Sequence, residues 1–298
     1  MRSFVALVGI VLGVSQQDAG LVDWNIEMMG VPRGAAIHQQ DSVMYGSRVL
    51  ASIDNNGEIL WRRHLRQEII SVASRGSTHY SVVSGSTGIC LVAYSDAGQY
   101  LWTSPSISSQ YHSIQASVGG IAVGFEDSVY FIDRENGKVS WNRTLKSLQK
   151  LALINGKLFA MSKDELLEID QRSGELLHSY QSPKSGIPIQ HQDSIAFLLN
   201  YNHNQISIMH AGDTEKQLAQ LPVDAHGCKI ADRGVISKYF FCDTPRTSFL
   251  LTLEDLKVTT LHRFKAGALQ GPAGTFESKE SKGPHTFSIL RLENKMVI

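Results

Sequence analysis

A turn-and-tryptophan pattern recurs along the chain, and it constrains the fold more than any other feature of the sequence. In each copy an aspartate precedes a polar turn with a glycine, and an aromatic ring follows four residues after the glycine. The clear copies read IDNNGEILW at 53–61, SDAGQYLW at 95–102, IDRENGKVSW at 132–141 and IDQRSGELLH at 169–178. Their aspartates are Asp54, Asp96, Asp133 and Asp170, and their glycines are Gly57, Gly98, Gly137 and Gly174. The glycines lie 41, 39 and 37 residues apart, so the chain contains an internal repeat.

Each copy is predicted to be a β-hairpin rather than a calcium loop. Calcium loops need a fixed set of acidic ligands, whereas the spacing from aspartate to glycine varies here. An aspartate closes a tight turn through its side chain, and a glycine supplies the positive φ that other residues adopt only at a cost. β-Branched and aromatic residues flank the turns, as is typical of strands.

Further short apolar segments between the hairpins are also predicted to be strands, which gives about four strands per repeat. The chain is therefore predicted to have an all-β fold. Repeats of about 40 residues with four short strands are typical of β-propellers, in which each repeat is one blade. We expect about six to seven blades over residues 20–298, and no closing repeat is evident, so the propeller is predicted to be incomplete in this chain. One bulky ring per blade suits the seam to the next blade. The rings assigned to this role are Trp24, Trp61, Trp102 and Trp141.

The N-terminus is predicted to carry a signal peptide over residues 1–15. Arg2 precedes an apolar run from Phe4 to Val14, which is too short to span a bilayer and has the length of a signal-peptide core. A buried N-terminal strand is the alternative interpretation of this run. A signal peptide would place the domain in a secretory compartment, where Asn142 of the sequon NRT is a candidate glycosylation site.

Charge and motif content argue against several function classes. Lys+Arg and Asp+Glu are equal at 28 each, and the densest basic run is RRHLR at 62–66, which is a poor footprint for nucleic acid. The sequence contains no CxxC, HxH or HExxH motif, so nothing in it indicates zinc or thioredoxin-type chemistry. We therefore predict no catalytic, cofactor-binding or metal-ligating residues. The cysteines are Cys90, Cys228 and Cys242, so at least one thiol is unpaired within the chain.

The aspartate, glycine and strand-terminal tryptophan are similar to the tryptophan-docking repeat of PQQ-type, or quinoprotein-like, propellers. Within that superfamily the chain resembles the family of subunit 1 of the endoplasmic reticulum membrane protein complex. The resemblance rests on DWNIEMMG at 23–30, NGEILWRRHL at 56–65 and the segment from Cys228 to Cys242, in this order. It covers the chain from Trp24 to about Leu261.

The resemblance implies a non-catalytic scaffold without a cofactor, on the lumenal side of the endoplasmic reticulum. Its partners would be the other subunits of a complex that inserts transmembrane segments without energy input. Family members are longer, with a second lumenal region and a C-terminal membrane helix. We therefore expect this chain to be an N-terminal part of a longer protein or a shortened member. Membrane association is expected through the complex or through such a helix.

The resemblance also implies a disulfide between Cys228 and Cys242, with Cys90 free. A turn at Ala231–Gly234 would separate two strands in this segment, and the two cysteines lie almost symmetrically about it. They could then face each other across an antiparallel hairpin at a separation that suits a disulfide. Two buried thiols are the alternative.

Two other function classes remain open. A PQQ-type dehydrogenase would need a site for an anionic quinone and a calcium ion. Several such enzymes stack the quinone on a vicinal disulfide, and this sequence has no adjacent cysteine pair. A different propeller scaffold, such as a lumenal stress sensor or a bacterial barrel-assembly lipoprotein, would share the architecture. The lipoprotein is disfavoured because no cysteine follows the apolar run.

Overall fold

The computed structural model describes the greater part of the chain. The described residues are 5–7, 25–27, 32–37, 41–54, 58–183, 186–200, 202–231, 236, 239–254, 256–265, 290–292 and 295–297. Within them every regular element is a β-strand except one 3-10 turn, η1 (Val223–Ala225). The chain divides into two compact units, of which unit 1 comprises residues 1–121, 132–140 and 273–298, and unit 2 comprises residues 122–131 and 141–272.

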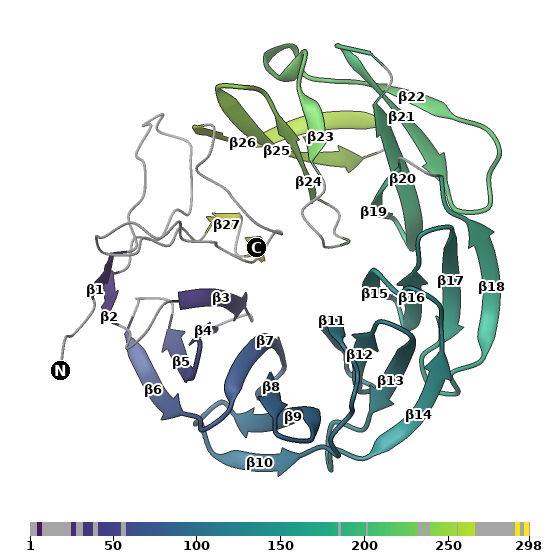
Figure 1. The fold of residues 1–298 in the computed structure, drawn as a ribbon. Helices are drawn as coiled ribbons and strands as arrows, with labels where there is room; N and C mark the ends of the chain where they lie inside the picture. Colours follow the sequence, from purple (N-terminus) through teal and green to yellow (C-terminus); the bar gives the residue numbers. More distant parts are fainter. Residues whose placement is uncertain are drawn as a thin grey trace. The chain divides into compact units, whose positions relative to one another are not determined.

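Unit 1 contains two four-stranded antiparallel sheets, each a meander of consecutive strands (Figure 1). The first sheet consists of β3 (Pro32–Ile37), β4 (Asp41–Gly46), β5 (Val49–Asp54) and β6 (Ile59–His64). The second consists of β7 (Glu68–Arg75), β8 (Thr78–Gly85), β9 (Gly88–Ser95) and β10 (Tyr100–Thr103). The repeated turn joins the last two strands of each sheet, so the strand that carries the tryptophan is always an edge strand.

Two further meanders follow the same plan. The third sheet consists of β11 (Tyr111–Ala116), β12 (Ile121–Phe125), β13 (Ser128–Ile132) and β14 (Val139–Thr144), and the division between the units falls within its residues. The fourth, in unit 2, consists of β15 (Lys150–Ile154), β16 (Lys157–Met161), β17 (Glu165–Asp170) and β18 (Leu176–Gln181). The expectation of four strands per repeat therefore holds through four consecutive repeats.

The last large sheet departs from that plan, because two meanders share one eight-stranded sheet in unit 2. The first meander consists of β19 (Ile187–His191), β20 (Ser194–Asn200), β21 (Gln205–His210) and β22 (Gln217–Gln220). The second consists of β23 (Lys229–Ala231), β24 (Tyr239–Asp243), β25 (Thr247–Glu254) and β26 (Lys257–Lys265). Their edge strands β22 and β26 pair in parallel at Gln220 and Lys257. Among the described strands of the other repeats, the last strand of a meander pairs with no strand of the next meander, whereas here β22 and β26 pair with each other.

Four short strands complete the described elements. β1 (Val5–Leu7) pairs with β2 (Asn25–Glu27), and β27 (Leu290–Leu292) pairs with β28 (Lys295–Val297). The rest of the predicted signal peptide and Trp24 lie outside the described residues.

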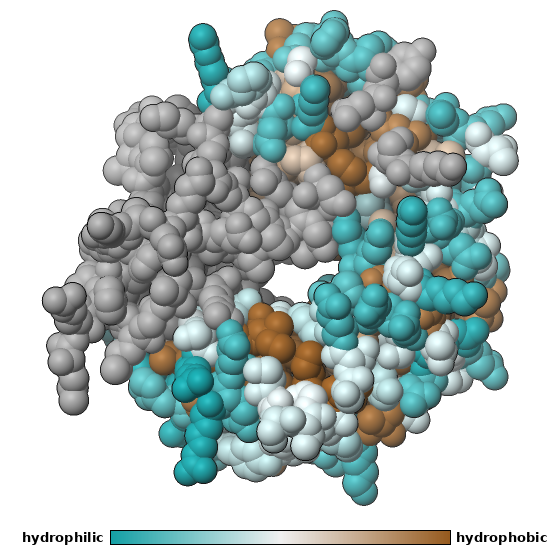
Figure 2. Space-filling view, in the orientation of Figure 1, coloured by the Kyte–Doolittle hydropathy of each residue, from teal (hydrophilic) through white to brown (hydrophobic). Residues whose placement is uncertain are grey.

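The buried clusters join either two successive sheets within one unit or the two meanders of the eight-stranded sheet. In unit 1, Val43 of the first sheet packs in one cluster with Val83 of the second, and both are fully buried. In unit 2, Phe159 of the fourth sheet shares a cluster with Phe197 of β20. Strand β12 is buried along its whole length, as expected for a strand covered on both faces, whereas the edge strand β18 is largely exposed. Hydrophobic residues on the visible surface form separate patches in a mostly hydrophilic background (Figure 2).

Candidate functional site

The glycines of the repeated turns lie directly against tryptophan rings. Gly98, Gly137 and Gly174 have φ values of 71°, 72° and 73°. A Cβ atom added at these glycines would come within 2.4 to 2.7 Å of an indole carbon. Each position therefore requires glycine for two reasons. Its backbone has a positive φ, and a tryptophan ring lies too close to leave room for a Cβ atom. The predicted positive φ of Gly137 and Gly174 is confirmed, and Gly57 lies outside the described residues.

Each tryptophan contacts the turn of the following repeat rather than its own. The three indole N–H groups donate to turn carbonyl oxygens over 2.5 to 2.9 Å. The pairs are Trp61 with Asp96, Trp102 with Arg134, and Trp141 with Gln171. Trp102 is buried, whereas Trp61 and Trp141 are half-buried. The indoles lie at equivalent places in successive repeats and fasten one sheet to the next.

The second turn needs a correction of register, because Ser95 and not Asp96 holds the first position. Ser95 N donates to Gln99 O over 2.9 Å, and the Ser95 hydroxyl accepts from Gln99 N. Asp54 makes the same pair of contacts with Glu58 in the first turn. Serine and aspartate can both cap a turn through a side-chain oxygen. Asp96 is the next residue, and its carbonyl oxygen accepts the indole of Trp61.

An arginine strengthens two of these seams. Arg63 Nε donates to Gly98 O over 2.7 Å, and Arg143 Nη1 donates to Gly174 O over 2.9 Å. Both arginines lie two residues after the docking tryptophan, and a leucine follows two residues later, in WRRHL at 61–65 and WNRTL at 141–145. Alternate residues of a strand share one face, so the three side chains point into the same seam. This W-x-R-x-L pattern was readable in the sequence but was missed there.

The fourth repeat replaces tryptophan by tyrosine. His178 occupies the tryptophan's place in the sequence but is exposed, and the ring that lies against the next turn glycine, Gly212, is that of Tyr180. The Tyr180 hydroxyl donates to Glu168 over 2.9 Å, and Lys157 Nζ lies 2.7 Å from the same carboxylate. Burial and the neighbouring Glu168 raise the pKa of Tyr180 to about 12. Burial alone would raise the pKa of Glu168, but the bonds from Lys157 and Tyr180 and the nearby positive charges hold it below its ordinary value.

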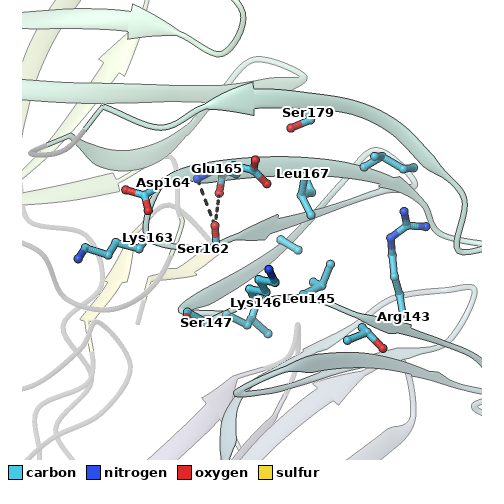
Figure 3. Close-up of a pocket in the computed structure, with 14 residues that line it drawn as sticks. Arg143, Leu145, Lys146, Ser147, Ser162, Lys163, Asp164, Glu165, Leu167 and Ser179 are labelled. Atoms are coloured by element: carbon cyan, nitrogen blue, oxygen red, sulfur yellow. Dashed lines mark hydrogen bonds between the residues drawn. The ribbon is translucent and has the colours of Figure 1, made fainter.

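Unit 2 contains a pocket of about 680 Å³ where β14 ends (Figure 3). Its lining comes from the end of β14 and the loop 145–148, from β16, β17 and the turn between them, and from β18. Lys163 and Asp164 lie at one end, Arg143 lies at the other, and Lys146 lies between them (Figure 3). The Ser162 hydroxyl bonds the backbone of Glu165 and holds the β16–β17 turn that forms one wall. The arrangement combines an apolar floor with a charged, solvent-exposed rim.

Cys228 and Cys242 form a disulfide with a Cα–Cα distance of 5.4 Å, which confirms the predicted crosslink. The predicted register is wrong by two residues, because Cys242 lies opposite Ile230 and Cys228 precedes β23. The bond therefore runs diagonally between the strands, where side chains still approach each other. Cys90 is free and buried, and its burial raises the pKa of the thiol. The disulfide indicates an oxidising, secretory-type compartment.

Other candidate residues are distributed over separate places. Asn142 is exposed on the edge strand β14, where solvent reaches its side chain. In the described part of the chain, no group of three or more His, Cys, Asp or Glu side chains is placed to hold a metal ion. Over the same residues, no helix has the length and hydrophobicity that crossing a membrane requires.

Comparisons with known structures place the chain among β-propellers. BamB from Moraxella catarrhalis is similar with a TM-score of 0.55 and 13% identity, over 92% of this chain and 86% of that chain. The computationally designed protein Ika8 is similar with a TM-score of 0.60 and 12% identity, over 100% and 96%. A chain of the mitotic checkpoint complex is similar with a TM-score of 0.56 and 10% identity, over 88% and 84%. At these identities the likeness shows the fold.

A search of the curated proteins finds no match to this chain. A family model described as "Outer membrane protein assembly factor BamB" matches residues 14–175 and 90–216, which together span more than half of the chain. Successive four-stranded sheets, tryptophans docked on the following turn and this family match agree on a PQQ-like propeller. The chain therefore belongs to the PQQ_2 family of β-propellers, whose model carries the name of the assembly factor BamB.

Proposed function

We propose that this chain is a non-catalytic lumenal scaffold subunit of the endoplasmic reticulum membrane protein complex, which supports energy-independent insertion of transmembrane segments. The observation that carries the proposal is the disulfide between Cys228 and Cys242. The resemblance of the sequence to subunit 1 implies a bond between this same pair of cysteines. A structural disulfide also suits the oxidising lumen of the endoplasmic reticulum.

The electrostatics of the described residues favour binding over acid–base catalysis. Enzyme sites commonly gather groups with shifted pKa values in a cleft. The groups with shifted pKa values are Tyr80, Cys90, Tyr94, Tyr111, Glu168, Asp170 and Tyr180, and none of them lines the pocket at the end of β14. Burial and structural hydrogen bonds account for these shifts. Rigid sheets that present exposed loops are suited to binding partner proteins.

Affinity purification of the tagged full-length gene product from solubilised endoplasmic reticulum membranes tests the proposal. We expect the other insertase subunits in near-equal amounts. Gly137→Ala, which disturbs a docking seam, should reduce this recovery, whereas Gly156→Ala should not, because no atom lies within 4 Å of a Cβ at Gly156. A lone protein with quinone-dependent dehydrogenase activity would support the PQQ-type enzyme alternative instead.

The family match favours one second candidate, a different propeller scaffold. The matching model is named after an outer membrane assembly factor, and scaffolds of several kinds share this fold. The same purification, carried out from the total membranes of the source cells, distinguishes the candidates. Recovery of a barrel-assembly complex or of a kinase-linked receptor, in place of insertase subunits, would support the second candidate.

A further inference from the structure

The pocket at the end of β14 continues the seam that the W-x-R-x-L strand closes. Trp141 and Arg143 fasten the seam to the turn 171–174 through their bonds to Gln171 and Gly174. Arg143 and the residues that follow it, 144–148, line the pocket of about 680 Å³, so the pocket begins where the seam ends. Leu145 is the next residue on that face of the chain, and it is buried at the pocket floor.

The apolar surface of the pocket that water reaches belongs to Leu167, which is half-buried, and to the exposed Leu176. Leu145, Leu148 and Ala160 lie behind it as buried members of a core cluster. Leu176, on β18, lines the pocket and is 42% exposed. Burying such surface against a ligand is favourable because it removes apolar atoms from water. Lining residues from each part of the pocket, Lys146, Glu165 and Leu176, are exposed, so the pocket is an open groove, which suits an extended chain better than an enclosed small molecule.

Charge is divided unevenly along the groove. Of the two acidic lining residues, Asp164 belongs to the β16–β17 turn and Glu165 is the first residue of β17, and Lys163 lies near them (Figure 3). Arg143 lies at the opposite end, and Lys146 lies between the two ends (Figure 3). Arg143 and Lys146 therefore make one end and the middle of the groove cationic, while Lys163, Asp164 and Glu165 together give the other end one net negative charge. The bond to Gly174 holds the Arg143 guanidinium in place, which lowers the entropy lost on binding an anion.

We propose that this groove binds a short extended segment of a partner protein in which an apolar side chain stands next to an acidic one. The apolar side chain would pack against Leu167 and Leu176, and the carboxylate would lie near Arg143 and Lys146. The inference rests on the proposed function, because a scaffold requires protein partners, and it assigns one surface of the chain to one class of partner segment.

The test uses the full chain and four fluorescein-labelled nonapeptides in a fluorescence anisotropy titration. One peptide has a central leucine flanked by aspartates, the second has the leucine replaced by serine, the third has the aspartates replaced by lysines, and the fourth carries both changes. We expect the leucine–aspartate peptide to bind at least about tenfold more tightly than the other three, and less tightly as salt is raised.

Two pairs of variants locate the binding site. Leu176→Asp should weaken binding of the leucine–aspartate peptide about tenfold, whereas Leu177→Asp should not, because Leu177 is equally exposed but lies outside the pocket lining. Lys146→Glu should shift the preference toward the leucine–lysine peptide, while Lys138→Glu, also exposed and outside the pocket, should leave it unchanged.

Binding that Leu176→Asp and Lys146→Glu leave unaltered, or no binding of any peptide, would overturn the inference. A change from monomer to dimer that Leu176→Asp abolishes would assign the groove to a second copy of the chain and would also overturn it. Recovery of insertase subunits together with no peptide binding in the titration would refute the groove assignment and leave the proposed function standing. Peptide binding without insertase subunits would instead refute the proposed function and leave the groove assignment standing.

Discussion

Gly137→Ala should destabilise the chain far more than the same substitution at Gly156, a turn glycine with no ring against it. An alanine at the φ of Gly137, 72°, costs about 1–2 kcal/mol through backbone strain. Its Cβ would also lie 2.4 Å from Cε3 of Trp102, so the buried indole must leave its place. Displacing a buried aromatic ring approaches the cost of removing it, about 3–5 kcal/mol. We expect a total loss of about 3–5 kcal/mol because the displaced ring retains part of its contacts.

Gly156→Ala is the matched control. Gly156 has φ 80°, and no atom lies within 4 Å of a Cβ built on it, so only the backbone strain of about 1–2 kcal/mol applies there. Urea unfolding followed by far-UV circular dichroism measures both variants without relying on tryptophan fluorescence. In a Trp102→Ala background, the cost of Gly137→Ala should fall to that of the control, because the clash has gone. Equal losses for Gly137→Ala and Gly156→Ala in the native background would refute the docking argument.

Four further predictions concern separate parts of the chain. Trp102→Ala alone should lower the free energy of unfolding by about 3–5 kcal/mol, and a loss below about 1 kcal/mol in urea unfolding would contradict the docked ring. Cys228→Ser should lower it by about 3 kcal/mol, and peptide mapping without reductant should find the native Cys228–Cys242 pair unalkylated. The lowered pKa of Glu168 means that its stabilising effect is complete above the ordinary value of 4.5 and is lost as pH falls through the folded-state pKa. Glu168→Gln should therefore flatten the acid limb of a stability–pH profile, and an unchanged limb would contradict the ion pair. Protein from secretory-pathway membranes should shift to lower mass on treatment with an N-glycosidase, and Asn142→Gln should abolish the shift.

The repeat was predictable from sequence because its signals are local. The turn between β13 and β14 contains its own cap, since Asp133 Oδ1 accepts from Glu135 N and Asn136 N over 2.7 and 3.2 Å. The displacement from Asp96 to Ser95 could not be read from spacing, because both residue types cap turns and only the backbone pairing of Ser95 with Gln99 decides between them.

The features that sequence reasoning missed depend on partners far along the chain. Arg63 and Arg143 each donate to a glycine carbonyl that lies 31 to 35 residues later, so their role appears only when the sheets are packed. The parallel pairing of Gln220 with Lys257 likewise joins two repeats and leaves no periodic signal. The pocket at the end of β14 is built from three separate segments, 143–148, 160–167 and 176–179, and no single one of them resembles a binding motif.

Because each tryptophan docks on the following repeat, the seams can form only in order from the N-terminus to the C-terminus as the chain is synthesised. The carbonyl that accepts each indole lies 30 to 35 residues closer to the C-terminus. A ribosome adds about 5–20 residues per second, so each newly emerged sheet must wait for seconds with an uncovered ring before its partner turn arrives. Nascent chains that pause in these intervals would expose an indole to chaperones, and the stretch between Trp61 and Gly98 is the first place where this vulnerability arises among the seams described.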